Sequence, residues 1–148
     1  MNVYAENKKA LHEFEVQETL EAGIELLGIE VKSVRSHKIS LVGSYIFPRH
    51  GEVWLVGATI APYQPNNTPK DYEQTRERKI LLRKQEIQYL VGKFSTKGLT
   101  LLPLRVYNKN NRIKLLIAVA RKFKKHDKRE RMKERETHRT VERTLKEI

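Results

Sequence analysis

The sequence predicts a mostly β protein, a small antiparallel barrel with two to three helices and a basic C-terminal tail. Three observations support this fold class: predicted strands outnumber predicted helices, they follow one another as hairpins, and glycines punctuate them. Barrels of the oligonucleotide-binding type combine short antiparallel strands in this way. Apolar residues lie mostly before residue 121, so we expect the barrel in residues 1–120 and the tail in residues 121–148.

The first predicted β segment is residues 14–31, where Phe14 and Val16 alternate with polar residues. Gly23 and Gly28 in this segment suggest a bulge or a sharp bend. The stretch "GIEVKSVRSHK" overlaps the end of the segment. Its i, i+3 valines allow a short helical turn whose cations face outward.

Two further strands are predicted in residues 43–60, around the turn "PRHG". Residues 61–77 contain three prolines and almost no apolar side chains, which predicts a long connection. Long connections within compact domains are often functional or mobile.

The second half of the chain predicts one helix and one hairpin. Apolar residues recur at i, i+3, i+4 and i+7 within residues 83–94, which indicates a helix with one buried stripe. Residues 99–107 and 113–120 are apolar strands joined by the turn-rich "NKNNR". Pro103 lacks an N–H donor, so it predicts a sheet edge or a bulge at this position.

The net charge of +12 indicates a polyanionic partner, RNA or DNA before an acidic membrane. Half of this charge lies in residues 121–148, which hold twelve Lys or Arg against six Asp or Glu. The chain has no cysteine, which excludes disulfides, thiolate catalysis and thiolate zinc sites. No apolar stretch approaches the roughly 20 residues that span a bilayer, and the N-terminus lacks the apolar core of a signal peptide. We therefore expect a cytoplasmic protein without membrane contact.

No catalytic motif is recognisable. "VGKFS" at 91–95 lacks the flanking residues of a phosphate-binding loop, and its spacing fits the helix stripe better. The five histidines are not paired at metal-ligand spacing, and "HD" at 126–127 fits a charged segment better than a metal phosphohydrolase. The sequence therefore supports neither an enzyme nor a cofactor.

The tail has an ordered charge pattern. On a helix, Arg131, Arg135, Arg139 and Arg143 fall at successive i, i+4 positions and form one guanidinium ridge. Apolar residues are too sparse to dock such a helix, and isolated helices are marginal in water. We expect a tail that is disordered or partly helical when free and helical on a polyanion. The alternative is an inert, charged solubility tail.

Six stretches resemble one family in the order in which the family has them: "NKKALHEF", "ETLEAGIELLGIEVKSVR", "GEVWLVGATIAPY", "RERKILLRKQEI", "GLTLLPLRVYNKNNRIKL" and "HDKRERMKER". The chain is therefore similar to the SsrA-binding protein (SmpB) family of bacterial trans-translation. The resemblance implies an oligonucleotide-binding-type barrel with flanking helices and no catalytic activity. It also implies binding to the tRNA-like domain of transfer-messenger RNA (SsrA RNA), near its elbow.

The implied task is the rescue of stalled 70S ribosomes. The family accompanies the alanyl-charged RNA, with elongation factor Tu and GTP, to ribosomes that lack a sense codon. The tail would lie as a helix in the decoding centre and the empty mRNA channel, which permits tagging of the nascent peptide. Two alternatives remain: a general single-strand-binding or ribosomal structural protein, and an RNA-processing enzyme.

By the same resemblance, eight barrel residues face or flank the RNA: Asn7, Glu21, Lys32, Arg35, Arg78, Lys79, Leu81 and Lys114. For Glu21 the alternative is a strand-end carboxylate paired with a lysine, and for Lys32 and Arg35 it is a solvated helix face. Trp54 and Tyr107 are expected in the core rather than as stacking platforms.

Nine tail residues are expected in the decoding centre and the mRNA channel: His126, Asp127, Lys128, Arg129, Arg131, Lys133, Arg135, Arg139 and Arg143. The sequence departs from the family pattern at Phe123, where Gly is common, and in the loop at 61–77. Ile29 stands where Thr is frequent, a change that we expect to be mild.

Overall fold

The structure, a computed structural model, describes residues 2–124 and contains the following elements. In chain order they are β1 (Val3–Glu6), α1 (Lys8–Glu13), β2 (Phe14–Ile24), α2 (Gly28–Arg35), β3 (Ile39–Ser40), β4 (Tyr45–Arg49), β5 (Glu52–Val56), β6 (Thr59–Ile60), the 3-10 helix η1 (Pro65–Asn67), β7 (Arg78–Leu81), α3 (Lys84–Phe94), β8 (Leu99–Lys109) and β9 (Arg112–Lys122).

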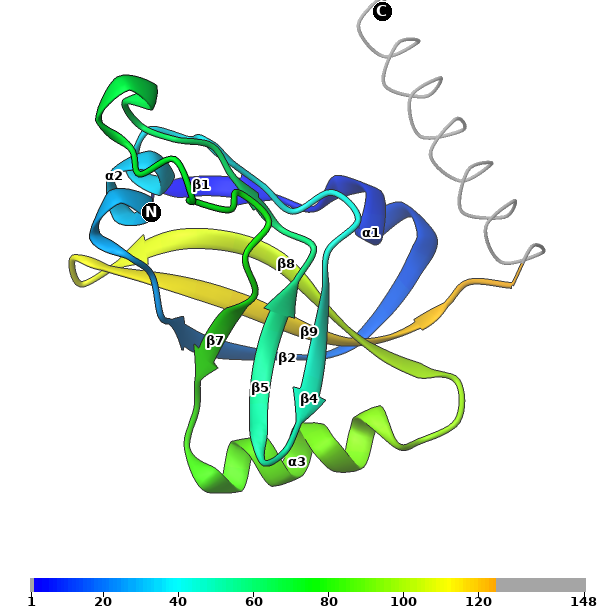
Figure 1. The fold of residues 1–148 in the computed structure, drawn as a ribbon. Coiled ribbons are helices and arrows are strands. Elements are labelled where there is room, and N and C mark those ends of the chain that lie inside the picture. Colours follow the sequence, from blue (N-terminus) through cyan, green and yellow to red (C-terminus); the bar gives the residue numbers. More distant parts are fainter. Residues whose placement is uncertain (1, 125–148) are drawn as a thin grey trace, which may run out of the picture.

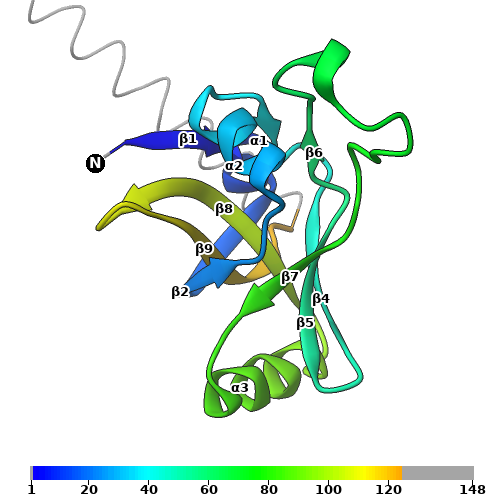
Figure 2. The same cartoon turned by 60° about the vertical axis from the view of Figure 1, so that its left-hand side comes forward.

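The strands form one antiparallel sheet in the order β1-β8-β9-β2-β7-β5-β4, and β3 pairs with β6 in a separate ribbon. The sheet curls until β4 lies beside β8, which makes a small, partly open barrel (Figure 1). Seen from the side, β2, β8 and β9 form one curved wall, and β4, β5 and β7 form the other (Figure 2). The predicted fold class, a mostly β antiparallel barrel with two to three helices, is confirmed, and the described residues contain three α-helices.

Two predicted hairpins have the backbone geometry that a two-residue turn requires. His50 and Gly51 join β4 to β5 with φ angles of 51° and 76°, and Asn110 and Asn111 join β8 to β9 with 51° and 62°. Positive φ at both central residues is the signature of the type I′ turn, whose twist matches that of the paired strands. Asn and Gly tolerate this conformation best, and His is also enriched among the other residues with positive φ, which agrees with the composition of both turns.

The predicted irregularity at Pro103 is confirmed as a bulge, because the register of β8 against β9 shifts between Pro103 and Arg105. β8 is not an edge strand, since it pairs with β1 on its other side. A second bulge interrupts β2 between Val16 and Glu18. The bulges let the two longest hairpin strands and β2 curve around the core.

Of the predicted bulge or bend at Gly23, the bulge is not found. The register of β2 is regular there, and a Cβ atom on Gly23 would lie 3.2 Å from the Cβ of Leu81. Gly23 instead allows β7 to approach β2 closely. Gly28 begins α2, so the predicted strand over 14–31 ends at Ile24.

The predicted helix in residues 83–94 is confirmed as α3, which lies across one end of the barrel (Figures 1 and 2). Only part of its stripe is buried: Leu90 is fully enclosed, whereas Val91 and Phe94 are 40% and 38% exposed. The Phe94 ring packs edge-on against Phe47 of β4. β1 and α1 were not predicted from the residue pattern. They lie with α2 at the end of the barrel opposite α3 (Figure 1).

Most buried side chains form one cluster inside the barrel, and Ala10, Leu102 and Ala120 form a smaller one beneath α1. β9 continues to Lys122, two residues beyond the predicted end of the barrel. The Phe123 N–H then donates to the Glu13 carbonyl at 3.0 Å. Within the described range, none of the helices is sufficiently long and apolar to span a membrane. The predicted tail residues from His126 to Arg143 lie outside the described residues.

Candidate nucleic-acid interface

One groove on the barrel surface brings together three of the predicted RNA-facing residues. It is lined by residues of α2, β7, β2 and β9, has a volume of about 460 Å³, and is named here the α2–β7 groove. Its lining combines apolar side chains with cations, and the members that matter most are Leu26, Val31, Leu81, Arg35, Arg112 and Lys114. Arg35, Leu81 and Lys114 lie 33 or more positions apart in sequence, so their meeting is a product of the fold.

Arg35 is held in place by hydrogen bonds to β1, to β8 and to the turn between β8 and β9. Its guanidinium donates to the Tyr4 hydroxyl and to the Asn111 carbonyl, both at 3.0 Å. A longer bond reaches the Asn108 side chain at 3.4 Å. A guanidinium has five N–H donors, so further donors remain for a phosphate or a base edge. The alternative of a merely solvated helix face does not describe Arg35.

Lys32 and Lys79 lie outside the lining of this groove. Lys32 is exposed on α2, as the predicted helical turn implies. Lys79 lies on the outer face of β7, with its ammonium 3.2 Å from the Glu52 carboxylate. Both cations are accessible to a large anion that extends beyond the groove.

Glu21 is paired within the protein. Its carboxylate accepts a hydrogen bond from the Tyr107 hydroxyl and lies 3.1 Å from the Lys109 ammonium. The Tyr107 hydrogen bond is the main cause of the lowered pKa of Glu21, with Lys109 and Lys114 acting in the same direction. Burial and the Glu21 carboxylate raise the pKa of Tyr107. This geometry matches the alternative of a carboxylate paired with a lysine, and an RNA contact of Glu21 stays a prediction.

Asn7 does not face outward, which corrects the prediction for this residue. The side chain is buried and caps α1, since its Oδ1 accepts from the Ala10 N–H at 3.2 Å. Its amide nitrogen donates to the Pro103 carbonyl at 2.9 Å. Asn is among the residues that best satisfy the free N–H groups at a helix start. Asn7 therefore joins α1 to the bulge of β8.

Arg78 also differs from the prediction, because its side chain is fully buried. Side chains alternate between the two faces of a strand. On β7, Arg78 and Ile80 point into the core, while Lys79 and Leu81 point outward. Arg78 thus cannot present its charge to RNA in this structure.

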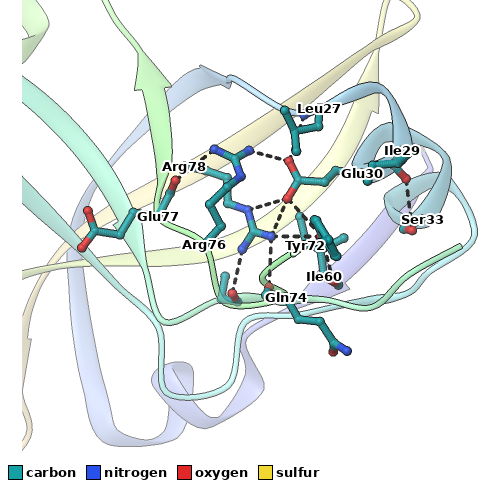
Figure 3. Close-up of polar contacts among 11 residues, drawn as sticks. Leu27, Ile29, Glu30, Ser33, Ile60, Tyr72, Gln74, Arg76, Glu77 and Arg78 are labelled. Carbon is teal, nitrogen blue, oxygen red and sulfur yellow. Dashed lines mark hydrogen bonds and ion pairs between the residues drawn. The ribbon is translucent and has the colours of Figure 1, made fainter. Parts of the chain in front are cut away.

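The partner of Arg78 is Glu30, a fully buried carboxylate on α2 (Figure 3). Arg78 donates to one oxygen of Glu30 from Nε at 3.0 Å and from Nη2 at 2.5 Å. Arg76 donates to the other oxygen, which also accepts the Leu27 N–H at 2.9 Å. Tyr72 adds a bond from its hydroxyl at 3.1 Å. Both oxygens of the Glu30 carboxylate therefore accept at least two hydrogen bonds each.

Glu30 was not predicted as a functional residue from the sequence. A carboxylate at the third position of a helix is a known signal, because it bonds the N–H that precedes the helix. Its pairing with Arg78 joins residues 48 positions apart and is not visible in any local pattern. Within residues 2–124, no group of three or more His, Cys, Asp or Glu side chains is arranged to hold a metal ion.

A family model described as SmpB protein matches residues 4–147 of the chain. The chain belongs to the SmpB family.

Relatives agree with this assignment over nearly full length. The SsrA-binding protein of Rubrobacter xylanophilus is 48% identical, and that of Thermosynechococcus vestitus is 44% identical; each match covers 99% of this chain and 97% of the relative. The SsrA-binding protein of Limosilactobacillus reuteri is 43% identical over 98% of this chain and 92% of its own length.

A solved structure described as "tmRNA-SmpB: a journey to the center of the bacterial ribosome" contains a similar fold. The match has a TM-score of 0.67 at 43% identity, and it covers 81% of this chain and 84% of the other.

Proposed function

We propose that this protein is an RNA-binding adaptor of trans-translation, which binds the tRNA-like domain of transfer-messenger RNA and accompanies it to stalled ribosomes. The observation that carries the proposal is the α2–β7 groove, found in a chain of the SmpB family. Relatives named SsrA-binding proteins match it over nearly their whole length. As in the family, its role is that of an adaptor and not of an enzyme.

The chemistry of the groove suits a structured RNA. Arg35, Arg112 and Lys114 supply charge for phosphates, which dominate the affinity of proteins for nucleic acids. Leu81 is 50% exposed beside them and offers an apolar surface to a sugar or an unstacked base. Lys32 and Lys79 extend the cationic surface along α2 and β7.

The remaining steps concern residues and partners beyond the groove. The tail from His126 to Arg143 enters the decoding centre and the empty mRNA channel of the 70S ribosome. Elongation factor Tu with GTP accompanies the complex through its own contact with the charged RNA. The protein acts in the bacterial cytoplasm, where ribosomes stall.

The decisive experiment compares the affinity for a tRNA-like RNA with the affinity for a single strand of equal length. The adaptor binds the structured RNA more tightly, whereas a general single-strand-binding protein shows the opposite order. Lys114→Gln should weaken the structured complex and reduce the slope of log Kd against log salt concentration by roughly 0.7 to 0.9. Lys97→Gln is the matched control, since Lys97 is exposed outside the groove.

Two results would refute the proposal. Equal affinity for both RNAs would exclude recognition of a tRNA-like shape, and multiple turnover of RNA in magnesium would show an RNA-processing enzyme.

A further inference from the structure

α2 and β7, two of the elements that line the α2–β7 groove, are joined by a buried ion pair. α2 presents Val31 and Arg35 to the groove and Glu30 to the interior. β7 presents Leu81 to the groove and Arg78 to the interior. The Glu30–Arg78 contact therefore links the element that carries Arg35 to the element that carries Leu81 (Figure 3).

The same pair also holds the long connection between β6 and β7. The Arg78 guanidinium donates to the Ala58 carbonyl at 2.9 Å and to the Gln74 carbonyl at 3.0 Å. The Tyr72 hydroxyl, with its single O–H donor, lies between the Glu30 carboxylate at 3.1 Å and the Ile60 carbonyl at 2.9 Å. The residue before β6 and the end of the connection thus meet at one guanidinium. This explains how a segment with three prolines and few apolar side chains is held against α2.

Stability is a weak reason for such an arrangement. Removing two charges from water costs several kcal/mol per ion, and apolar pairs of similar volume often replace buried ion pairs without loss of stability. A bidentate contact between Arg and a carboxylate instead restricts distance and orientation. Apolar side chains cannot impose this directional restraint on α2 and β7.

We propose that Glu30 and Arg78 are positioning residues for RNA binding, which set the separation and orientation of α2 and β7 at the groove. Both side chains are fully buried and touch no ligand, so they act through Arg35 on α2 and Leu81 on β7. The proposal rests on the proposed function, since it concerns the same groove.

The test uses the full chain and two variants. In Glu30→Met/Arg78→Met the ion pair is replaced by apolar side chains of similar volume, which removes the directional restraint. Glu30→Gln retains the shape of the side chain and loses its charge. The readouts are the thermal midpoint, the Kd for a tRNA-like RNA well below that midpoint, and native-state hydrogen exchange of the α2 and β7 amides.

We expect both variants to bind the RNA about tenfold or more weakly while still folded, with faster exchange at Val31 and in β7. The control is Glu77→Gln, which removes an exposed ion pair to Arg49 at 2.7 Å and leaves the affinity unchanged. A purely structural role would lower the midpoint and leave the affinity of the folded protein as it is.

Each result is decisive. A folded variant of either kind that binds RNA with wild-type affinity overturns the proposal. If the wild-type protein itself shows no preference for the tRNA-like RNA, the proposed function fails. Hydrogen exchange then tests the positioning separately, and unchanged protection of α2 and β7 in the double variant overturns it.

Discussion

The Glu30 carboxylate remains charged in a fully buried position. Burial raises its pKa, but hydrogen bonds from Arg76, the Leu27 N–H and Arg78 outweigh this effect, so the pKa lies below the ordinary value of 4.5. A carboxyl with a lowered pKa in the folded state stabilises the protein above the pKa of the unfolded chain. This stabilisation is lost as the pH falls through the lower, folded-state pKa.

We therefore expect the free energy of unfolding to decrease as the pH falls below about 4.5, and Glu30→Gln to flatten this decrease. Urea denaturation at a series of pH values measures both. The flattening is partial, because the pKa of Glu21 is lowered as well. An identical pH dependence in Glu30→Gln and the wild-type protein would contradict the assignment of this charge.

Arg78 and Lys79 are adjacent cations with opposite environments, which permits a matched pair of substitutions. Arg78→Ala leaves the buried Glu30 charge without its main partner and should destabilise the protein by about 3–5 kcal/mol. Lys79→Ala removes an exposed ion pair to Glu52 and should lower the free energy of unfolding by about 1 kcal/mol or less. Urea denaturation at neutral pH gives both values. Similar costs for the two substitutions would mean that the burial of Arg78 is not energetically important.

At the scale of elements, the contact between β2 and β7 depends on the absence of a side chain at Gly23. An alanine Cβ there would lie 3.2 Å from the Leu81 Cβ, so β7 would have to move away from β2. We expect Gly23→Ala to lower the thermal midpoint and, because Gly23 lines the groove, to weaken RNA binding.

The same substitution at Gly92 is the control. Gly92 lies within α3, and an added Cβ meets no atom within 4 Å. Alanine is favoured over glycine in a helix by about 1 kcal/mol, so Gly92→Ala should raise the midpoint. Opposite signs at the two sites are the expected result of differential scanning calorimetry. A higher thermal midpoint for both variants would show that β7 accommodates a side chain at position 23 without strain.

α1 shows how an element can depend on one capping residue. Asn7 satisfies an N–H at the start of this six-residue helix and bonds the bulge of β8 at the same time. Helices this short are unstable alone and rely on tertiary contacts. A loss of RNA binding on substitution of Asn7 would therefore follow from a displaced α1 rather than from a lost RNA contact.

At the scale of the whole molecule, the end of β9 defines where the chain can be cut. Ending the chain after Lys124 retains β9, the Arg121–Glu15 ion pair at 2.5 Å and the bond from Phe123 to Glu13. We expect this protein to keep the wild-type thermal midpoint and affinity for a tRNA-like RNA. It should fail to support peptide tagging on stalled ribosomes, because the tail is missing.

Ending the chain after Ala120 instead removes the last strand residues that pair with Phe14 and Glu15. This cut should lower the midpoint, since the paired end of β2 loses its neighbour. The comparison of the two cuts separates the tail from the barrel. Loss of RNA affinity in the longer protein would place part of the RNA-binding surface in the tail.

Local patterns were sufficient for much of the fold. Alternating apolar residues, the turns "PRHG" and "NKNNR" and the stripe of α3 each reflect interactions within a few residues, and the hairpins and the helix were found where they were predicted. β1 and α1 were missed because they are short, and their strand pairing and capping bonds reach β8 about a hundred positions away.

The α2–β7 groove could be predicted only in part. Resemblance to the SmpB family named Arg35, Leu81 and Lys114, which do line it, but also Asn7 and Arg78, which are buried. The sequence shows that a side chain is positively charged. It does not show which face of a strand this side chain occupies.

Composition and short-range pattern therefore established a basic, hairpin-rich β protein with its helix α3 and its excess of charge beyond residue 120. The direction of each cation followed from the strand or helix face that it occupies, and the groove exists because α2, β2, β7 and β9 meet in the tertiary structure. The physical reason is distance along the chain: Glu30 and Arg78 are 48 positions apart, and the low polarity of the core makes each of them depend on the other.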